Sequence, residues 1–165
     1  MFHAVANLYI CAMSEFTKER QDLINYCTTF IENQINHVQS VIDSAKESAQ
    51  NESKSSAGDK HETGKSLMQL EQENNAMLLD NMLKQKPAIK VLESFSPSEE
   101  VKMGSIVEAN NGVYYIGIGI GLVKIEGKDF FVISPTAPVG KLFMGKKKGD
   151  EVSFNGRKIQ ILEVR

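Results

Sequence analysis

A seven-residue repeat of apolar side chains is the strongest constraint that this sequence places on its fold. Between Ile24 and Ala49, apolar and small residues alternate at spacings of four and three. They form two rows: Ile24, Ile31, Val38 and Ala45, then Thr28, Ile35, Ile42 and Ala49. This spacing is typical of one seam of a coiled coil. Because so narrow a stripe cannot bury itself in a globular core, it predicts a long helix, from about Ser14 to Gln50, with a partner helix.

The partner is expected from the second helical segment, Glu62 to about Gln85, which is rich in leucine and methionine. Asn74 and Asn75 interrupt its apolar pattern, and such polar positions can fix the register of a helix pair. Pro87 is predicted to end this helix. The polar stretch 51–64 separates the two segments. We therefore expect an antiparallel α-helical coiled-coil hairpin over residues 13–86, with its tip near 51–64.

The rest of the chain has the periodicity of strands. Residues 87–100 contain Ser-Pro-Ser-Glu-Glu and are expected to be a linker. The predicted strands are Val101–Ala109, one or two within Val113–Ile125, Phe130–Ile133, Glu151–Phe154 and Arg157–Val164, with a short helix at Ala137–Met144. Asn-Gly pairs mark two hairpin turns. The prediction for 101–165 is a small antiparallel sheet with one helix against it, so the chain belongs to the α+β class.

Composition excludes several classes of protein. Of the 165 residues, 41% are hydrophobic and 24% are charged, and the net charge is −2, which favours a soluble globular protein without global steering towards nucleic acid. Residues 1–12 are apolar but too short to span a membrane and lack the pattern of a signal peptide. Their status as a tail stays open, because Met13 could be the true start. Cys11 and Cys27 form no CxxC pair, which favours a reducing, cytoplasmic setting.

The tip carries two carboxylates three residues apart, Asp59 and Glu62. One interpretation is structural: Asp59 caps the second helix and Glu62 occupies the third helical position, as in a capping box. The other is a shared metal site, because Mg²⁺ is commonly held by one or two carboxylates, waters and phosphate oxygens. Two carboxylates cannot hold the ion alone. The other ligands would come from another protein and from RNA, and the free protein is expected to bind no cofactor. His61 lies between them and is a weak indication of a transition-metal site.

Two further motifs favour structural interpretations. Gly117-Ile118-Gly119-Ile120-Gly121 lacks the GxGxxG spacing of a dinucleotide site, and no helix is expected to follow it. Its glycines more plausibly mark bends or close packing of strands. Lys146-Lys147-Lys148 precedes Gly149-Asp150 and is expected to be a solvated turn rather than a nucleic-acid contact.

The sequence resembles the Gre family of bacterial transcript cleavage factors over roughly residues 13–165. Gly58-Asp59-Lys60-His61-Glu62 is similar to the G-D-x-x-E motif at the family's hairpin tip. The more specific match is the segment 133–152, which is similar to the family's S-P-…-A-L-x-G-K-x-x-G-D-x-V signature. It reads Ile-Ser-Pro-Thr-Ala-Pro-Val-Gly-Lys-Leu-Phe-Met-Gly-Lys-Lys-Lys-Gly-Asp-Glu-Val. Val101–Val107 also fits the strand that opens the family's C-terminal domain.

The resemblance implies a cofactor of RNA polymerase that is not itself an enzyme. An FKBP-like C-terminal domain would dock on the polymerase, and the coiled coil would enter its secondary channel. Asp59 and Glu62 would help to hold the second Mg²⁺ of the polymerase active site near the 3′ end of the nascent RNA. Backtracked RNA would then be cut endonucleolytically. The implied protein is a cytoplasmic monomer with no membrane partner.

Departures from the family pattern keep alternatives open. Thr63-Gly64-Lys65-Ser66 follows the acidic pair where the family has Asn and then Tyr, and Ala137-Pro138-Val139-Gly140 lengthens the signature, as in the related Rnk-like regulators. A polymerase regulator without cleavage is therefore the main alternative. A prolyl isomerase would need an apolar pocket to which Phe130, Phe131 and Phe143 could contribute. A structural coiled-coil module would expose the apolar stripe and oligomerise.

Overall fold

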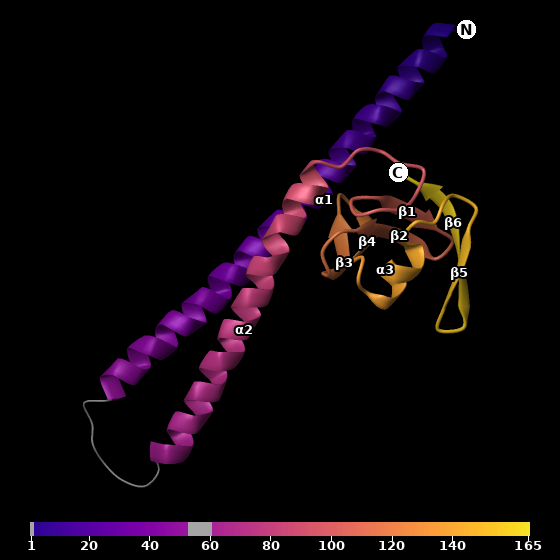
Figure 1. The fold of residues 1–165 in the computed structure, drawn as a ribbon. Coiled ribbons are helices and arrows are strands. Elements are labelled where there is room, and N and C mark those ends of the chain that lie inside the picture. The colour runs from indigo at the N-terminus through magenta and orange to yellow at the C-terminus, as the bar shows by residue number, and fades with distance from the viewer. Residues whose placement is uncertain (1, 53–60) are drawn as a thin grey trace. The chain divides into compact units, whose positions relative to one another are not determined.

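The computed structural model describes residues 2–52 and 61–165, and the side chains of residues 18–47 and 69–165. Two long helices, α1 (Phe2–Glu52) and α2 (His61–Glu93), come first along the chain (Figure 1). The elements that follow are β1 (Ile106–Ala109), β2 (Gly112–Ile116), β3 (Gly121–Ile125), β4 (Lys128–Ile133), α3 (Pro138–Phe143), β5 (Glu151–Phe154) and β6 (Arg157–Val164). The predicted α+β class, with helices preceding a sheet that carries one short helix, is confirmed.

The chain forms two compact units, and α1 and α2 each contribute to both. One unit, which we call the sheet unit, consists of Met1–Thr28 and Pro87–Arg165. The other, the helical unit, is Thr29–Lys86. Among the described residues of α1 and α2, none of the helical segments is long and apolar enough to cross a membrane.

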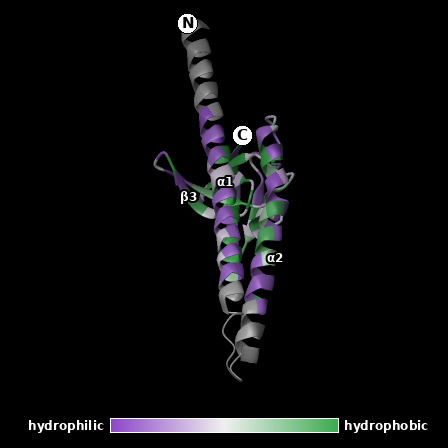
Figure 2. Ribbon diagram, turned by 90° about the vertical axis from the view of Figure 1, so that its left-hand side faces the viewer, coloured by the Kyte–Doolittle hydropathy of each residue, from purple (hydrophilic) through white to green (hydrophobic). Residues whose placement is uncertain are grey.

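In the helical unit, the predicted apolar stripe is the buried face of α1. Ile31 and Val38 are almost fully buried, and Ile35 and Ile42 are half-buried. The parts of α1 and α2 in this unit lie side by side (Figure 2). The less exposed positions of α2 are a mixed set: Gln72, Asn75, Leu79, Met82 and Gln85. Several large apolar side chains of α2 are therefore exposed rather than buried: Leu70, Met77, Leu78 and Leu83.

The predicted helix boundaries are wrong in two places. Helix α1 begins at Phe2 rather than near Ser14, so it takes in most of the segment 1–12. Helix α2 does not end at Pro87 but continues to Glu93. Proline removes one helical hydrogen bond, a cost that tertiary packing can offset. Beyond Pro87, Ile89 and Leu92 are buried in the sheet unit. Part of the expected linker 87–100 is therefore helix.

The sheet has six strands in the order β3-β4-β2-β1-β6-β5. All neighbouring strands are antiparallel except β2 and β4, which pair in parallel from Val113↔Phe130 to Ile116↔Ile133. The sheet is therefore mostly antiparallel, as predicted, with one parallel pair that the prediction did not include. The parallel pair arises because β4 lies between β2 and β3: β3 runs opposite to β2, and its hairpin returns β4 in the direction of β2.

Local turn signals account for the hairpins. Asn155 and Gly156, with φ of 51° and 75°, connect β5 to β6 as the Asn-Gly pair predicted. Glu126 and Gly127 connect β3 to β4 with φ of 48° and 83°, the same two-residue geometry. The first predicted strand is shorter than expected, because only Ile106–Ala109 of Val101–Ala109 is a strand.

Alternating residues bury both faces of this sheet. On the face towards α3, Tyr114 and Ile116 join Phe143 in one apolar cluster. On the other face, Tyr115 is fully buried and interacts with Cys27 of α1. The segment of α1 that ends at Thr28 therefore completes the core of the sheet unit. The predicted C-terminal domain, residues 101–165, did not include this segment of α1.

Candidate functional site

The predicted tip carboxylates fall at the edge of what the structure describes. Asp59 lies outside the described residues. Glu62 is the second residue of α2, and its side chain lies outside the described ones. Among the side chains that are described, no group of three or more His, Cys, Asp or Glu residues could hold a metal ion. The geometry of the Asp59–Glu62 pair and its metal site stay predictions.

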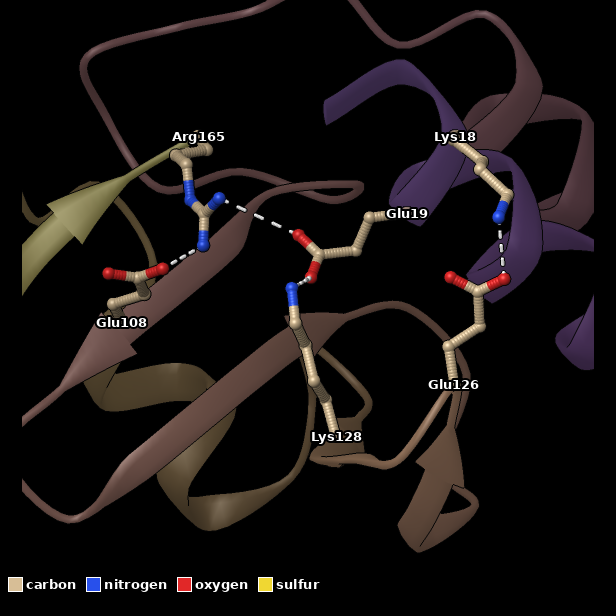
Figure 3. Close-up of polar contacts among 6 residues, drawn as sticks. All are labelled: Lys18, Glu19, Glu108, Glu126, Lys128 and Arg165. Carbon is tan, nitrogen blue, oxygen red and sulfur yellow. Dashed lines mark hydrogen bonds and ion pairs between the residues drawn. The ribbon is translucent and has the colours of Figure 1, made fainter. Parts of the chain in front are cut away.

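Three consecutive charged residues of α1 make contacts with other segments of the sheet unit. Glu19 accepts a hydrogen bond from Lys128 Nζ at 3.0 Å and lies 3.5 Å from an Arg165 guanidinium nitrogen (Figure 3). Arg165 also pairs with Glu108. Glu19 and Arg165 are largely shielded from water, with side chains 14% and 18% exposed. Shielding makes such pairs stronger than exposed ones, since water screens them less.

A neighbouring ion pair is exposed instead. Lys18 Nζ lies 2.6 Å from Glu126 Oε1, and both side chains are more than 60% exposed (Figure 3). The hydrogen bond and the charge of Glu126 raise the pKa of Lys18. Exposed pairs of this kind contribute little to stability.

Arg20 makes the third contact of this run. Its guanidinium donates to the Gly104 carbonyl and lies 3.9 Å from the centre of the Phe95 ring. Burial lowers its pKa. Gly104 is required there, because a Cβ at this position would lie 2.5 Å from the Phe95 ring and the backbone φ is +93°. Arg20 thus ties α1 to the segment that joins α2 to β1.

Beneath this contact lies a buried pair, Cys27 and Tyr115. Burial raises the pKa of Cys27 to about 12, against a smaller opposing effect of a hydrogen bond from the Ile118 backbone. Burial, assisted by Cys27, also raises the pKa of Tyr115. Both groups stay neutral in the folded protein near pH 7, so Cys27 lacks the thiolate that a nucleophile needs.

A pocket lies on the opposite face of the sheet, beside α3. Its volume is about 520 Å³, and its lining comes from the β1–β2 turn, β2, β4, α3 and the β5–β6 hairpin: Asn111, Tyr114, Phe131, Ile133, Val139, Phe154, Asn155, Arg157 and Ile159. Tyr114 stacks on Phe131 with ring centres 5.1 Å apart. Of the three phenylalanines considered for an apolar pocket, only Phe131 lines it. Phe130 and Phe143 are core residues, 1% and 0% exposed.

The segment 133–152 folds as the end of β4, a turn, α3, a second turn and the start of β5. Gly140 packs so closely that a Cβ there would lie 2.1 Å from the Ser134 carbonyl oxygen. In the second turn, Asp150 accepts a hydrogen bond from the Lys147 backbone at 2.9 Å. The signature's glycine, serine and aspartate positions thus have structural roles. Lys147 and Lys148 pair with Glu100 and Glu163, as a solvated turn would.

Sequence analysis did not identify two of these features. The run Lys18-Glu19-Arg20 precedes the apolar stripe and is indistinguishable from a solvated helix face, because its partners are 75 to 146 residues away in the chain. The pocket combines residues from β2, β4, α3, β5, β6 and two turns. Nothing local in the sequence indicated that Tyr114 and Phe131 would line one pocket.

No family model matches the chain, and no curated protein matches it.

Proposed function

We propose that this protein is a transcription elongation factor that binds bacterial RNA polymerase and stimulates cleavage of backtracked RNA. The observation that carries the proposal is the joint occurrence of two motifs in one α+β chain. Gly58-Asp59-Lys60-His61-Glu62 falls where α1 gives way to α2, and the segment 133–152 falls in the domain that follows. Both resemble the Gre family in sequence and in order along the chain.

The lengths of the helices suit the proposed insertion into a channel. Beyond Thr28, α1 continues to Glu52, which at about 1.5 Å per residue spans roughly 36 Å. The buried row of Ile31 and Val38 on this stretch is what a coiled-coil hairpin requires. We propose that this hairpin carries the connection 53–60 into the secondary channel, and that the sheet unit is an FKBP-like domain that docks on the polymerase outside it.

The proposed chemistry belongs to the polymerase, and this chain lends carboxylates to it. Asp59 and Glu62 would hold one Mg²⁺ together with ligands from the polymerase and from the RNA 3′ end. Carboxylate oxygens suit Mg²⁺, which commonly keeps several waters and needs few protein ligands. When bound, such a second ion activates the water that attacks the phosphodiester. The free protein is proposed to be a cytoplasmic monomer that holds no ion of its own.

A cleavage assay with a matched variant tests this function. RNA polymerase is stalled in a backtracked complex with labelled RNA, and the protein is added with Mg²⁺. The wild type should shorten the RNA from its 3′ end at least about tenfold faster than polymerase alone. The Asp59→Asn, Glu62→Gln double variant should bind the polymerase equally well and lose this stimulation, because it keeps side-chain size but removes the charges.

A polymerase regulator without cleavage is the second candidate. It is favoured by Ala137-Pro138-Val139-Gly140, which lengthens the signature, and by Thr63-Gly64 after the acidic pair. In that case wild type and double variant should both bind, both alter elongation and neither cut. Failure of both proteins to bind polymerase would contradict both candidates.

A further inference from the structure

The pocket beside α3 has the size and lining of a binding site. Ligand pockets typically occupy about 300–1,000 Å³ and are lined by apolar and aromatic side chains with a few polar groups. This one measures about 520 Å³. Its aromatic wall is held in place, because Phe131 stacks on Tyr114 and lies close over Gly112, where a Cβ would be 2.8 Å from the ring. Tyr114 in turn packs edge-on against Phe143. The wall is therefore formed before any ligand arrives.

The polar groups around this pocket include several hydrogen-bond donors. The Tyr114 hydroxyl accepts a hydrogen bond from the Asn111 amide at 2.8 Å, which leaves the hydroxyl proton for an acceptor. Asn155 and Arg157 lie in the exposed β5–β6 turn region at the rim. A guanidinium presents five N–H donors and no acceptor. The pocket thus offers an apolar interior and a rim suited to carbonyl and carboxylate oxygens.

Arg157 lines the pocket, whereas the next residue, Lys158, lies 2.7 Å from Glu151 and pairs with it. Arg157 has no carboxylate within 4 Å in the part of the chain that the structure describes. A positive charge without a partner, beside an apolar cavity, complements a ligand that carries an apolar group and a negative charge.

We propose that this pocket binds a peptide segment of a partner protein in which a bulky apolar side chain is followed directly by a carboxylate. The apolar side chain fills the space between Phe131 and Val139, and the carboxylate pairs with Arg157. The amides of Asn111 and Asn155 lie at the rim, where they can bond the peptide backbone. These backbone contacts favour a peptide over a small aromatic acid. The proposal does not rest on the function proposed above.

Peptide titration of the isotope-labelled full chain, followed by backbone amide NMR, tests the site. The probe is acetyl-Ala-Phe-Asp-Ala-amide. We expect saturable shifts at the amides of Phe131, Val139 and Arg157, with a dissociation constant below about 5 mM. Peptides with Phe→Ala or Asp→Asn should bind at least about fivefold more weakly, since each lacks one of the two recognised groups.

Variants of the protein test whether binding depends on this pocket or only on a general attraction between the peptide carboxylate and nearby cations. Arg157→Gln should abolish the difference between the Asp and Asn peptides, and Arg157→Lys should restore part of it. Lys158→Gln, which changes the neighbouring cation, should bind as the wild type does. Unchanged amide spectra away from the turn would show that the variants fold. The proposal is overturned if no saturable shift occurs, if Arg157→Gln discriminates as the wild type does, or if phenylacetate binds as tightly as the peptide.

Discussion

At the scale of single residues, Cys27 illustrates how burial decides chemistry. Its position within the apolar stripe region gave no sign of reactivity, and the structure buries the side chain completely. Burial disfavours the thiolate and raises the pKa of Cys27 from its ordinary value of 9.0 to about 12. Since the folded-state pKa is the higher one, the neutral thiol stabilises the fold fully below about pH 9. This contribution is lost as pH rises towards 12.

Cys27→Ala should remove this pH dependence. Between pH 8 and 10.5 the free energy of unfolding of the wild type should fall by about 2 kcal/mol more than that of the variant, because the unfolded thiol ionises and the folded thiol does not. Urea unfolding at several pH values measures this difference. Tyr115, whose pKa is raised mainly by burial, is present in both proteins, so most of its contribution cancels. Parallel curves for the two proteins would mean that Cys27 is not desolvated in solution.

The candidate tip site and the pocket differ in how far their residues can be identified from the sequence. Asp59 and Glu62 can be proposed from sequence because the spacing D-x-x-E is local, although the same spacing also suits helix capping. The pocket residues Tyr114 and Arg157 cannot, because they are 43 positions apart in the sequence and only the order of the strands brings them to one cavity. The spacing of residues in the sequence can indicate sites whose residues lie within one helical turn, whereas sites assembled across a sheet depend on the order of the strands.

At the scale of elements, α1 has its own attachment to the sheet through Glu19. Its carboxylate is shielded and shared between Lys128 and Arg165. Glu19→Gln should lower the free energy of unfolding by about 1–3 kcal/mol, because it leaves the shielded Arg165 guanidinium without this partner. Urea unfolding at low salt is the measurement.

The exposed pair provides the control for this prediction. Glu126→Gln removes the partner of Lys18, which is well exposed. Its urea midpoint should stay within error of the wild type, because water already screens the pair. Equal effects of the two substitutions would contradict the view that shielding by the α1–sheet contact strengthens the Glu19 interactions.

The elements themselves differ in how well the sequence predicts them. The short helix at Pro138–Phe143 and the hairpin at Asn155–Gly156 follow from local signals and were predicted closely. The end of α2 was not, because burial of Ile89 and Leu92 outweighs the helix-breaking tendency of Pro87. The parallel pairing of β2 and β4 was also missed, since turn residues fix neighbours along the chain but not which strand is inserted between them.

At the scale of the whole molecule, each long helix serves two units. The first part of α1 and the last part of α2 complete the sheet unit, whereas Thr29–Lys86 forms the helical unit alone. In the sequence, residues 53–60 connect the two helices near the middle of Thr29–Lys86. This organisation suits the proposed division of labour, in which one unit docks and the other delivers carboxylates.

The dependence of cleavage on Mg²⁺ tests the central claim most directly. If Asp59 and Glu62 help to hold the second ion, the wild type should lower the Mg²⁺ concentration for half-maximal RNA cleavage at least about tenfold relative to polymerase alone. The Asp59→Asn, Glu62→Gln variant, bound at saturation, should leave that concentration unchanged. If the variant lowers it as much as the wild type does, the carboxylates are helix-capping residues and the account of the tip is wrong.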